Sequence, residues 1–268
     1  MNKKIIDDIV FYIPFKKLRN AVREYLLEKL QLEYNKLSFL KDIQYKIDYY
    51  ISNQRFAYFN KFTIKASEET YEYVSNVLKQ YDVPFMLTQY HELEYILKNE
   101  KLIDGLFLEF GVYTGNTINL MSNILKDKIF YGFDSFEGLP ENWNGTIRHK
   151  GSFDLQGNLP NVNDNVKLIK GWFDETLPKF LIEHKEPVSF IHVDSDLYSS
   201  AKTIFDNLKD RIVVGTIIVF DEYYNYNNWK NHEYKAFQEF VKENNIKYKY
   251  LTFGLETTCS VIITDIQN

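Results

Sequence analysis

The sequence predicts an α/β protein with a Rossmann-like, mostly parallel seven-stranded sheet, an antiparallel C-terminal hairpin and a helical N-terminal region. From residue 106 onward, short apolar runs alternate with segments of helical periodicity, which is the pattern of parallel strands joined by helices. Before Gly105 there is no glycine, and the only prolines there are Pro14 and Pro84, so little interrupts a helix. We therefore expect a helical region over residues 1–84 and a sheet domain over residues 85–268.

The N-terminal region carries helical periodicity and positive charge. Leucine, valine and isoleucine recur at spacings of three, four and seven between residues 18 and 51. A second helix is expected over residues 67–80, with Ser67 as its N-cap, and a third over residues 89–99. Residues 1–65 hold 13 Lys and Arg against 7 Asp and Glu, a balance of +6, whereas the remainder holds 19 against 30. We expect this region to cover an acceptor site or to form a dimer contact.

The elements of the sheet domain follow from the alternation along the chain. Buried parallel strands are expected at 106–110, 129–133, 166–169, 188–193 and 216–220. Helices fit between or after them at 116–126, 175–184, 199–209 and 232–244. Residues 248–253 and 258–264 lie close enough in sequence to pair as an antiparallel hairpin. Five parallel strands closed by such a hairpin form the sheet of class I methyltransferases.

Composition bounds the class of protein. The single cysteine, Cys259, excludes an internal disulfide and favours a reducing compartment. No apolar run approaches the roughly 20 residues of a membrane span, so we expect a cytoplasmic protein, with peripheral contact through its basic N-terminus as an option. The body beyond residue 65 is acidic, which argues against a nucleic-acid partner.

Carboxylates stand at the ends of successive predicted strands. In an open α/β sheet, ligands bind outside the carboxyl ends of the strands. Several acids at one edge are costly unless a cation, a metal or ribose hydroxyls satisfy them. The acids concerned are Glu109, Asp134, Asp194, Asp196, Asp221 and Glu222.

The first two of these acids favour a nucleoside cofactor. Glu109, Gly111 and Gly115 lie where a strand turns into a helix, and glycine there lets the backbone approach a ligand. Asp134 ends the next strand, 25 residues beyond Glu109, at the distance at which an acid accepts both ribose hydroxyls. Glu109 would hold the amino group of an amino-acid moiety. The turn lacks the G-x-G-x-x-G of NAD sites, so the combination favours S-adenosylmethionine.

The later acids favour a magnesium site. Asp194 and the pair Asp221–Glu222 end neighbouring strands, and Mg²⁺ prefers hard oxygen ligands. A metal there would lower the pKa of a bound hydroxyl, after which an aspartate such as Asp194 completes the deprotonation. His192 is either a catalytic base or a strand residue that supports the site. The alternative is that these acids only cap the helices that follow.

Five segments in order resemble the macrocin O-methyltransferase family, whose members methylate sugar hydroxyls with S-adenosylmethionine and a divalent metal. The resemblance covers about residues 85–264, through LEFGVYTGNT, FDSFEGLPE, KGWFDETLP, HVDSDLYSS and FDEYY. It implies the following roles: Glu109, Gly111 and Gly115 at the methionine end of the cofactor, Asp134 and Ser135 at its ribose, Gly171, Trp172 and Phe173 at its adenine, and Asp194, Asp221 and Glu222 on Mg²⁺. Glu222 departs from the aspartate that the family favours at that position.

The sequence gives less information about the acceptor and the oligomeric state. The N-terminal stretch IVFYIPFKKLRNAVREYL resembles proteins of bacterial capsule and lipopolysaccharide gene clusters. We therefore expect a sugar-containing acceptor, free or linked to a nucleotide or lipid, and a homo-oligomer. Residues 135–165 hold four of the eleven glycines and predict a mobile lid. Residues 223–229 carry aromatics beside amides, which suit either a sugar or packing under the N-terminal helices.

Two other functions stay open on the sequence alone. Asp194-Ser-Asp196 is a D-x-D pattern, typical of metal-dependent glycosyltransferases that use a nucleotide-sugar. A methyltransferase-like scaffold that binds a partner through its helical N-terminus, without catalysis, is the other.

Overall fold

The structure, a computed structural model, describes residues 20–29 and 57–267. The chain divides into two compact units, residues 1–61 and residues 62–268. Residues 20–29 form a helix, as their periodicity predicts, and the rest of the predicted pattern between residues 18 and 51 lies outside the described residues. Among the described helices, none combines the length and the apolar character that crossing a membrane requires.

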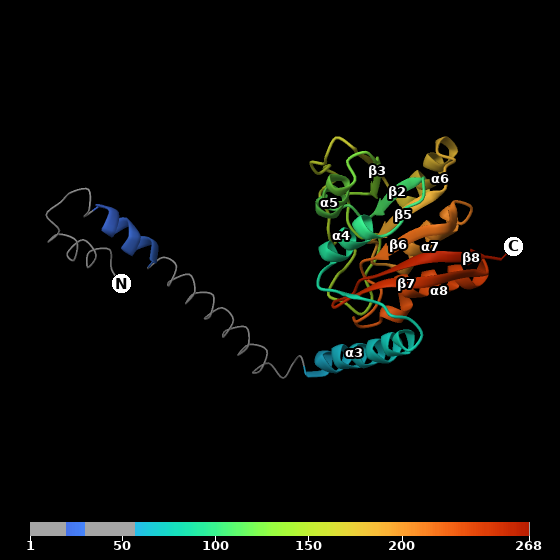
Figure 1. The fold of residues 1–268 in the computed structure, drawn as a ribbon, viewed down its shortest axis with the longest axis horizontal. Coiled ribbons are helices and arrows are strands. Elements are labelled where there is room, and N and C mark those ends of the chain that lie inside the picture. The colour runs from blue at the N-terminus through green and yellow to red at the C-terminus, as the bar shows by residue number, and fades with distance from the viewer. Residues whose placement is uncertain (1–19, 30–56, 268) are drawn as a thin grey trace. The chain divides into compact units, whose positions relative to one another are not determined.

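The second unit is built on one mixed sheet of eight described strands in the order β1-β7-β8-β6-β5-β2-β3-β4 (Figure 1). Only β8 runs opposite to the other described strands, because it pairs antiparallel with both β6 and β7. The strands are β1 (Phe85–Met86), β2 (Leu106–Phe110), β3 (Phe130–Asp134), β4 (Val166–Lys170), β5 (Val188–Val193), β6 (Ile212–Phe220), β7 (Ile246–Gly254) and β8 (Cys259–Ile266). The helices are α3 (Ala57–Leu78), α4 (Gln89–Asn99), α5 (Asn116–Ile124), α6 (Phe173–Glu183), α7 (Tyr198–Leu208), the 3₁₀ turn η2 (Trp229–Asn231) and α8 (Glu233–Glu243).

This is the predicted class of fold, although several strands and helices begin or end a few residues from their predicted bounds. The sheet has an eighth strand, since the two-residue β1 pairs parallel with β7. Two residues are too short for any sequence periodicity to reveal. The helix expected over residues 67–80 is α3, which extends back to Ala57, so Ser67 lies inside it and is not its N-cap. No glycine or proline interrupts the chain between residues 57 and 78, and the helix runs on accordingly.

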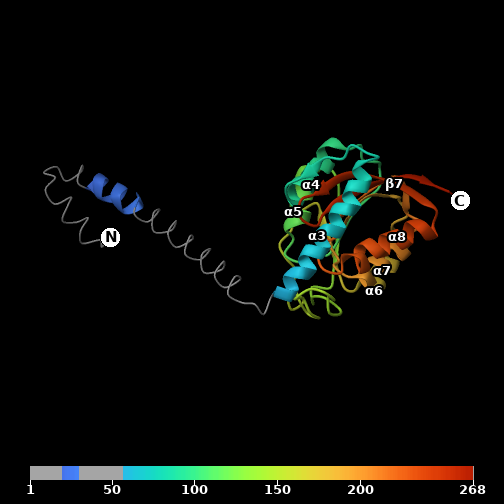
Figure 2. The ribbon, with the colours of Figure 1, turned by 90° about the horizontal axis from the view of Figure 1, so that it is seen from below.

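Helices cover both faces of the sheet, α4 and α5 on one side and α6, α7 and α8 on the other (Figure 2). Each face has its own apolar core. Side chains of α4 and α5, including Leu93 and Met121, pack with Phe107, Phe130 and Phe190 on the first face. The second and larger core lies on the opposite face. There, side chains of α6, α7 and α8 pack with the alternate residues of the same strands. A sheet buried on both sides explains why its strands read as continuous apolar runs.

The second half of α3 packs with the sheet domain. The Tyr73 hydroxyl hydrogen-bonds that of Tyr250 on β7, and the Tyr73 ring lies 5.7 Å from that of Trp229. The compact unit accordingly begins at Phe62, whereas the sequence placed a boundary between residues 84 and 85. Tyr223, Tyr224 and Trp229 are buried in this core, so packing, the second of the two alternatives for residues 223–229, describes these three aromatics.

Candidate active site

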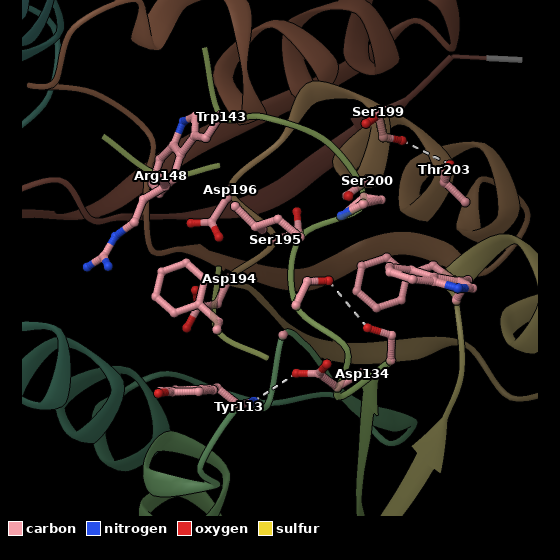
Figure 3. Close-up of a pocket in the computed structure, with 18 of the residues that line it drawn as sticks. Tyr113, Asp134, Trp143, Arg148, Asp194, Ser195, Asp196, Ser199, Ser200 and Thr203 are labelled. Atoms are coloured by element: carbon pink, nitrogen blue, oxygen red, sulfur yellow. Dashed lines mark hydrogen bonds between the residues drawn. The ribbon is translucent and has the colours of Figure 1, made fainter. Parts of the chain in front are cut away.

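A cavity of about 720 Å³ opens at the carboxyl ends of the parallel strands (Figure 3). Three parts of the chain enclose it: the turns that follow the strands, the start of α6 and α7, and the loop of residues 135–165. Its lining comprises Gly111, Tyr113, Asp134, Ser135, Gly138, Leu139, Pro140, Trp143, Arg148, Phe153, Trp172, Phe173, Asp174, Glu175, Asp194, Ser195, Asp196, Ser199, Ser200, Thr203, Asp221 and Glu222.

Sheet register brings the three predicted metal ligands together. Val193 on β5 pairs with Phe220 on β6, so Asp194 and Asp221 leave the sheet side by side. The Asp221 N–H donates to the carbonyl oxygen of Val193 at 2.9 Å, which carries the ladder into the site. Carboxylate oxygens of Asp194, Asp221 and Glu222 all lie within 4.8 Å of one another. The three partly buried acids form the floor of the cavity.

The electrostatics of this floor fit a divalent cation. Burial, followed by the charge of Asp221, raises the pKa of both Asp194 and Glu222 well above the usual range. Burial also raises the pKa of Asp221, although the nearby His192 opposes the rise. Glu222 Oε2 is buried without a hydrogen-bond partner among the described residues. Three converging hard oxygens with an unsatisfied acceptor are the donor set that Mg²⁺ takes.

Asp196 also faces the cavity, on a turn that Glu233 holds. Asp196 is 6% exposed and has a φ of 62°, in the left-handed region that non-glycine residues rarely adopt. Oε1 of the fully buried Glu233 accepts hydrogen bonds from Ser195 N–H at 2.9 Å, Ser195 Oγ at 3.1 Å and Asp196 N–H at 3.1 Å. Glu233, at the start of α8, escaped the sequence analysis because no spacing links it to residues 195–196.

On the cofactor side, the structure places Gly111 and Gly115 differently. Gly111 lines the cavity with a φ of 94°, and a Cβ there would lie 1.7 Å from the carbonyl oxygen of Asp194. Only glycine allows this approach of the β2 turn to the β5 turn. Gly115 is the N-cap of α5 with a φ of 81°, and it does not line the cavity. Gly111 is therefore positioned to contact a ligand, and Gly115 to shape the turn.

Asp134 lines the cavity, but much of its carboxylate binds the protein backbone. Oδ2 accepts hydrogen bonds from the N–H groups of Val112 at 2.9 Å and Tyr113 at 2.8 Å, and Oδ1 accepts from Phe136 N–H at 2.7 Å. A carboxylate has about four acceptor positions, so roughly one remains for a ribose hydroxyl rather than the predicted pair. Ser135 lies beside it, and its Oγ accepts from Glu137 N–H at 3.1 Å.

Glu109 and His192 form a buried pair outside the cavity. Both side chains are fully buried, and His192 Nδ1 donates to Glu109 Oε1 at 2.8 Å. Burial raises the pKa of Glu109; burial lowers and the Glu109 contact raises the pKa of His192, with a net rise. Neither residue lines the cavity. The geometry favours a supporting role for His192 over the catalytic one, and the contact of Glu109 with a cofactor amino group stays a prediction.

The predicted adenine segment follows β4. Trp172 and Phe173 line the cavity. The Phe173 ring packs edge to face with that of Phe110, with 5.3 Å between the ring centroids. Gly171 lies behind them and donates its N–H to the carbonyl oxygen of Asp134 at 2.9 Å. Aromatic rings at this edge suit the flat face of a base.

The loop of residues 135–165 forms one wall of the cavity. It contributes Trp143, Arg148 and Phe153, none of which the sequence analysis singled out. The loop is ordered by its own hydrogen bonds: Trp143 N–H donates to Arg148 O at 3.2 Å, and Thr146 N–H to Trp143 O at 3.2 Å. The Trp143 ring packs 5.5 Å from that of Tyr226, which connects this wall to the segment after β6.

Comparison with known proteins agrees with the motif series. A sequence model of the Macrocin-O-methyltransferase (TylF) family matches residues 87–254. Demethyldecarbamoylnovobiocin O-methyltransferase of Streptomyces niveus is 25% identical over 143 residues, which is 45% of this chain and 53% of that protein. 8-Demethyl-8-(2,3-dimethoxy-alpha-L-rhamnosyl)-tetracenomycin-C 4'-O-methyltransferase of Streptomyces olivaceus is 27% identical over 146 residues, 45% of this chain and 54% of that protein. The matches thus span about half of the length of these two relatives.

Solved structures show the same fold. The O-methyltransferase NovP superposes with a TM-score of 0.51 at 21% identity, over 66% of this chain and 78% of that one. The calicheamicin methyltransferase CalS11 gives 0.50 at 19% identity, over 76% and 91%. The predicted class I methyltransferase fold is confirmed.

Proposed function

Because the chain belongs to the macrocin-O-methyltransferase family, we propose that it transfers the methyl group of S-adenosylmethionine to a hydroxyl of a sugar-containing acceptor. The observation that carries the proposal is the convergence of Asp194, Asp221 and Glu222 within 4.8 Å on the cavity floor. That floor lies at the sheet edge where class I folds bind their ligands.

Different residues would bind the cofactor and the acceptor in the two halves of the cavity. Trp172, Phe173 and Asp134 line the part that suits a nucleoside, and Gly111 allows a ligand to approach the β2 turn. When bound, S-adenosylmethionine supplies an electrophilic methyl group on its sulfonium. The cavity walls would position an acceptor oxygen beside the bound cofactor.

Asp194, Asp221 and Glu222 would hold Mg²⁺. When bound, the metal supplies charge that lowers the pKa of an acceptor hydroxyl. Asp194 was the predicted proton acceptor; a bound metal would withdraw charge from its carboxylate and make it a weaker base. Asp196 lines the same cavity outside this ligand set, and its carboxylate takes the proton in our proposal.

The acceptor is proposed more narrowly as a sugar of a bacterial surface glycan. Its support is the likeness of residues 9–26 to proteins of capsule and lipopolysaccharide gene clusters, together with the rhamnosyl group in the name of one of the two curated relatives. A glycosyltransferase has only the D-x-D pattern of residues 194–196 in its favour. Asp194, one of the two acids in that pattern, is one of the three proposed metal ligands, and the family is one of methyltransferases.

The test is methyl transfer from labelled S-adenosylmethionine to a panel of glycan sugars and nucleotide-linked sugars. We expect transfer to at least one sugar, its loss in EDTA and its return with added Mg²⁺. Transfer that continues undiminished in the chelator contradicts the metal part of the proposal. The absence of cofactor binding by the folded protein contradicts the activity itself.

A further inference from the structure

The cavity is lined by many acids and a single cation. Arg148 is the one lysine or arginine among its lining residues, and its side chain is exposed. Among the described residues, no carboxylate lies within ion-pair distance of its guanidinium, although seven acids share the cavity. They are Asp134, Asp174, Glu175, Asp194, Asp196, Asp221 and Glu222. Burial raises the pKa of Asp196 and the charge of Arg148 opposes that rise, so the guanidinium lies near that acid without forming an ion pair. Its N–H donors remain available to an anionic ligand group.

Two aromatic rings hold Arg148 on one side of the cavity. The guanidinium lies 4.8 Å from the centroid of the Phe153 ring, and the Phe153 ring lies 5.5 Å from that of Tyr113, edge to face. Tyr113 belongs to the turn that follows β2. In Figure 3, Arg148 lies on the same side of the cavity as Asp196 and apart from Asp134, which marks the proposed ribose position.

The two residues of this ring pair have unusual backbone conformations. Tyr113 has a φ of 45° and Phe153 a φ of 70°, so both members of the ring pair adopt the left-handed conformation. Residues with such backbone conformations are strained and concentrate at ligand-binding positions. The two residues contact each other edge to face from different segments, and Phe153 contacts the guanidinium.

The start of α5 offers no competing anion site. The N–H groups of Val112 and Tyr113 already donate to Asp134, and Gly115 N–H donates to the carbonyl oxygen of Val112 at 2.8 Å. Residues 114–117 do not line the cavity. The donors that usually bind a carboxylate at a helix N-terminus therefore do not reach a ligand in this cavity.

We propose that Arg148 binds the α-carboxylate of S-adenosylmethionine. This inference rests on the proposed function. The methionine end of the cofactor brings one carboxylate into an acidic cavity, and the planar guanidinium is the lining group that matches it in charge and in hydrogen-bond geometry. Because Arg148 belongs to the loop of residues 135–165, the contact joins that loop to the β2 turn through the bound cofactor.

Calorimetry with two ligands that differ only in the carboxylate tests the assignment. S-adenosylmethionine and decarboxylated S-adenosylmethionine are titrated into the wild type, Arg148→Gln and Lys150→Gln. We expect Arg148→Gln to weaken the first ligand roughly tenfold, a charge-assisted contact discounted for exposure. Its affinity for the decarboxylated ligand stays unchanged. Lys150→Gln, which removes an exposed cation two residues away and outside the cavity, leaves both affinities unchanged.

The other outcomes overturn the inference. An equal loss for both ligands means that Arg148 acts through the shape of the loop, and no loss for either means that the carboxylate lies elsewhere. Arg148→Lys adds a check, since it keeps the charge but not the fork and should fall between wild type and Arg148→Gln. A wild type that binds neither ligand contradicts the proposed function, and the inference with it, before any variant is compared.

Discussion

The buried carboxylates of this protein fall into two groups that differ in where their partners come from. Glu92 receives hydrogen bonds from Thr252 and Thr258, and Glu109 and Glu233 likewise bind groups of the chain. The floor acids Asp194, Asp221 and Glu222 accept no hydrogen bond from a described N–H group or cation, and they line a cavity. Burial raises the pKa in both groups. A raised pKa therefore does not identify a ligand site by itself, and neither does an oxygen that lacks a partner among the described residues, since Glu109 and Glu233 each have one; carboxylates that converge on a cavity do.

The largest difference between the groups is expected on replacing a floor acid. Asp221→Asn should lower methyl transfer about thousandfold, since the charge stabilisation lost is worth several kcal/mol. Cofactor affinity should change by less than about threefold, because the cofactor's expected contacts lie elsewhere. Without metal, the unfolding midpoint should not fall, because the change removes one of several like charges. Steady-state kinetics, calorimetry and thermal unfolding measure the three effects.

Glu256→Gln is the matched control for that substitution, since Glu256 is an exposed acid close enough to raise the pKa of Asp221. It should leave turnover near that of the wild type. If Asp221→Asn instead unfolds the protein while keeping specific activity in the folded fraction, Asp221 belongs with the supporting acids.

A smaller effect, on stability alone, is expected for Glu92. Burial raises the pKa of this carboxyl from 4.5 to about 7, partly offset by the hydrogen bonds from Thr252 and Thr258. The folded state thus binds the proton more tightly than the unfolded state, so stability falls as pH rises between these values. The contribution lost over that window is up to about 3 kcal/mol. Denaturant unfolding from pH 4.5 to 7.5 should show a loss of stability that is smaller in Glu92→Gln than in the wild type by this contribution, because the other carboxyls with a raised pKa are common to both proteins.

Glu94→Gln on the same helix is the control, because Glu94 is exposed and pairs with Lys98. Its pKa is lowered by that hydrogen bond, so it cannot mimic the Glu92 trend. Parallel pH curves for the wild type and Glu92→Gln contradict the account of Glu92 as a buried acid that ionises at a cost.

The sequence predicted the features that depend on regular strands and helices. Strands 106–110 and 188–193 match β2 and β5 residue for residue, because buried parallel strands are continuous apolar runs. The convergence of Asp194 with Asp221 and Glu222 followed, since adjacent parallel strands end at one edge. Helix 89–99 also matches α4, whose Thr88 caps it by accepting a hydrogen bond from His91 N–H.

The remaining features depend on contacts between distant residues. Asp134 was expected to bind both ribose hydroxyls, but nothing in its spacing reveals that Val112, Tyr113 and Phe136 occupy it. The pairing of Glu109 with His192 arises from the register of β2 with β5, which the separate strands do not specify. Arg148 contacts Phe153, and Phe153 and its ring partner Tyr113 have left-handed conformations although neither is glycine.

Metal binding at the floor is the most direct test of the account. Mg²⁺ is titrated calorimetrically into the wild type and Asp221→Asn, each saturated with S-adenosylhomocysteine. The account predicts one Mg²⁺ per wild-type chain, with binding lost in Asp221→Asn although cofactor binding is retained. Equal Mg²⁺ binding by the two proteins, or none by a wild type that binds the cofactor, would contradict the assignment of Asp194, Asp221 and Glu222 as the metal site.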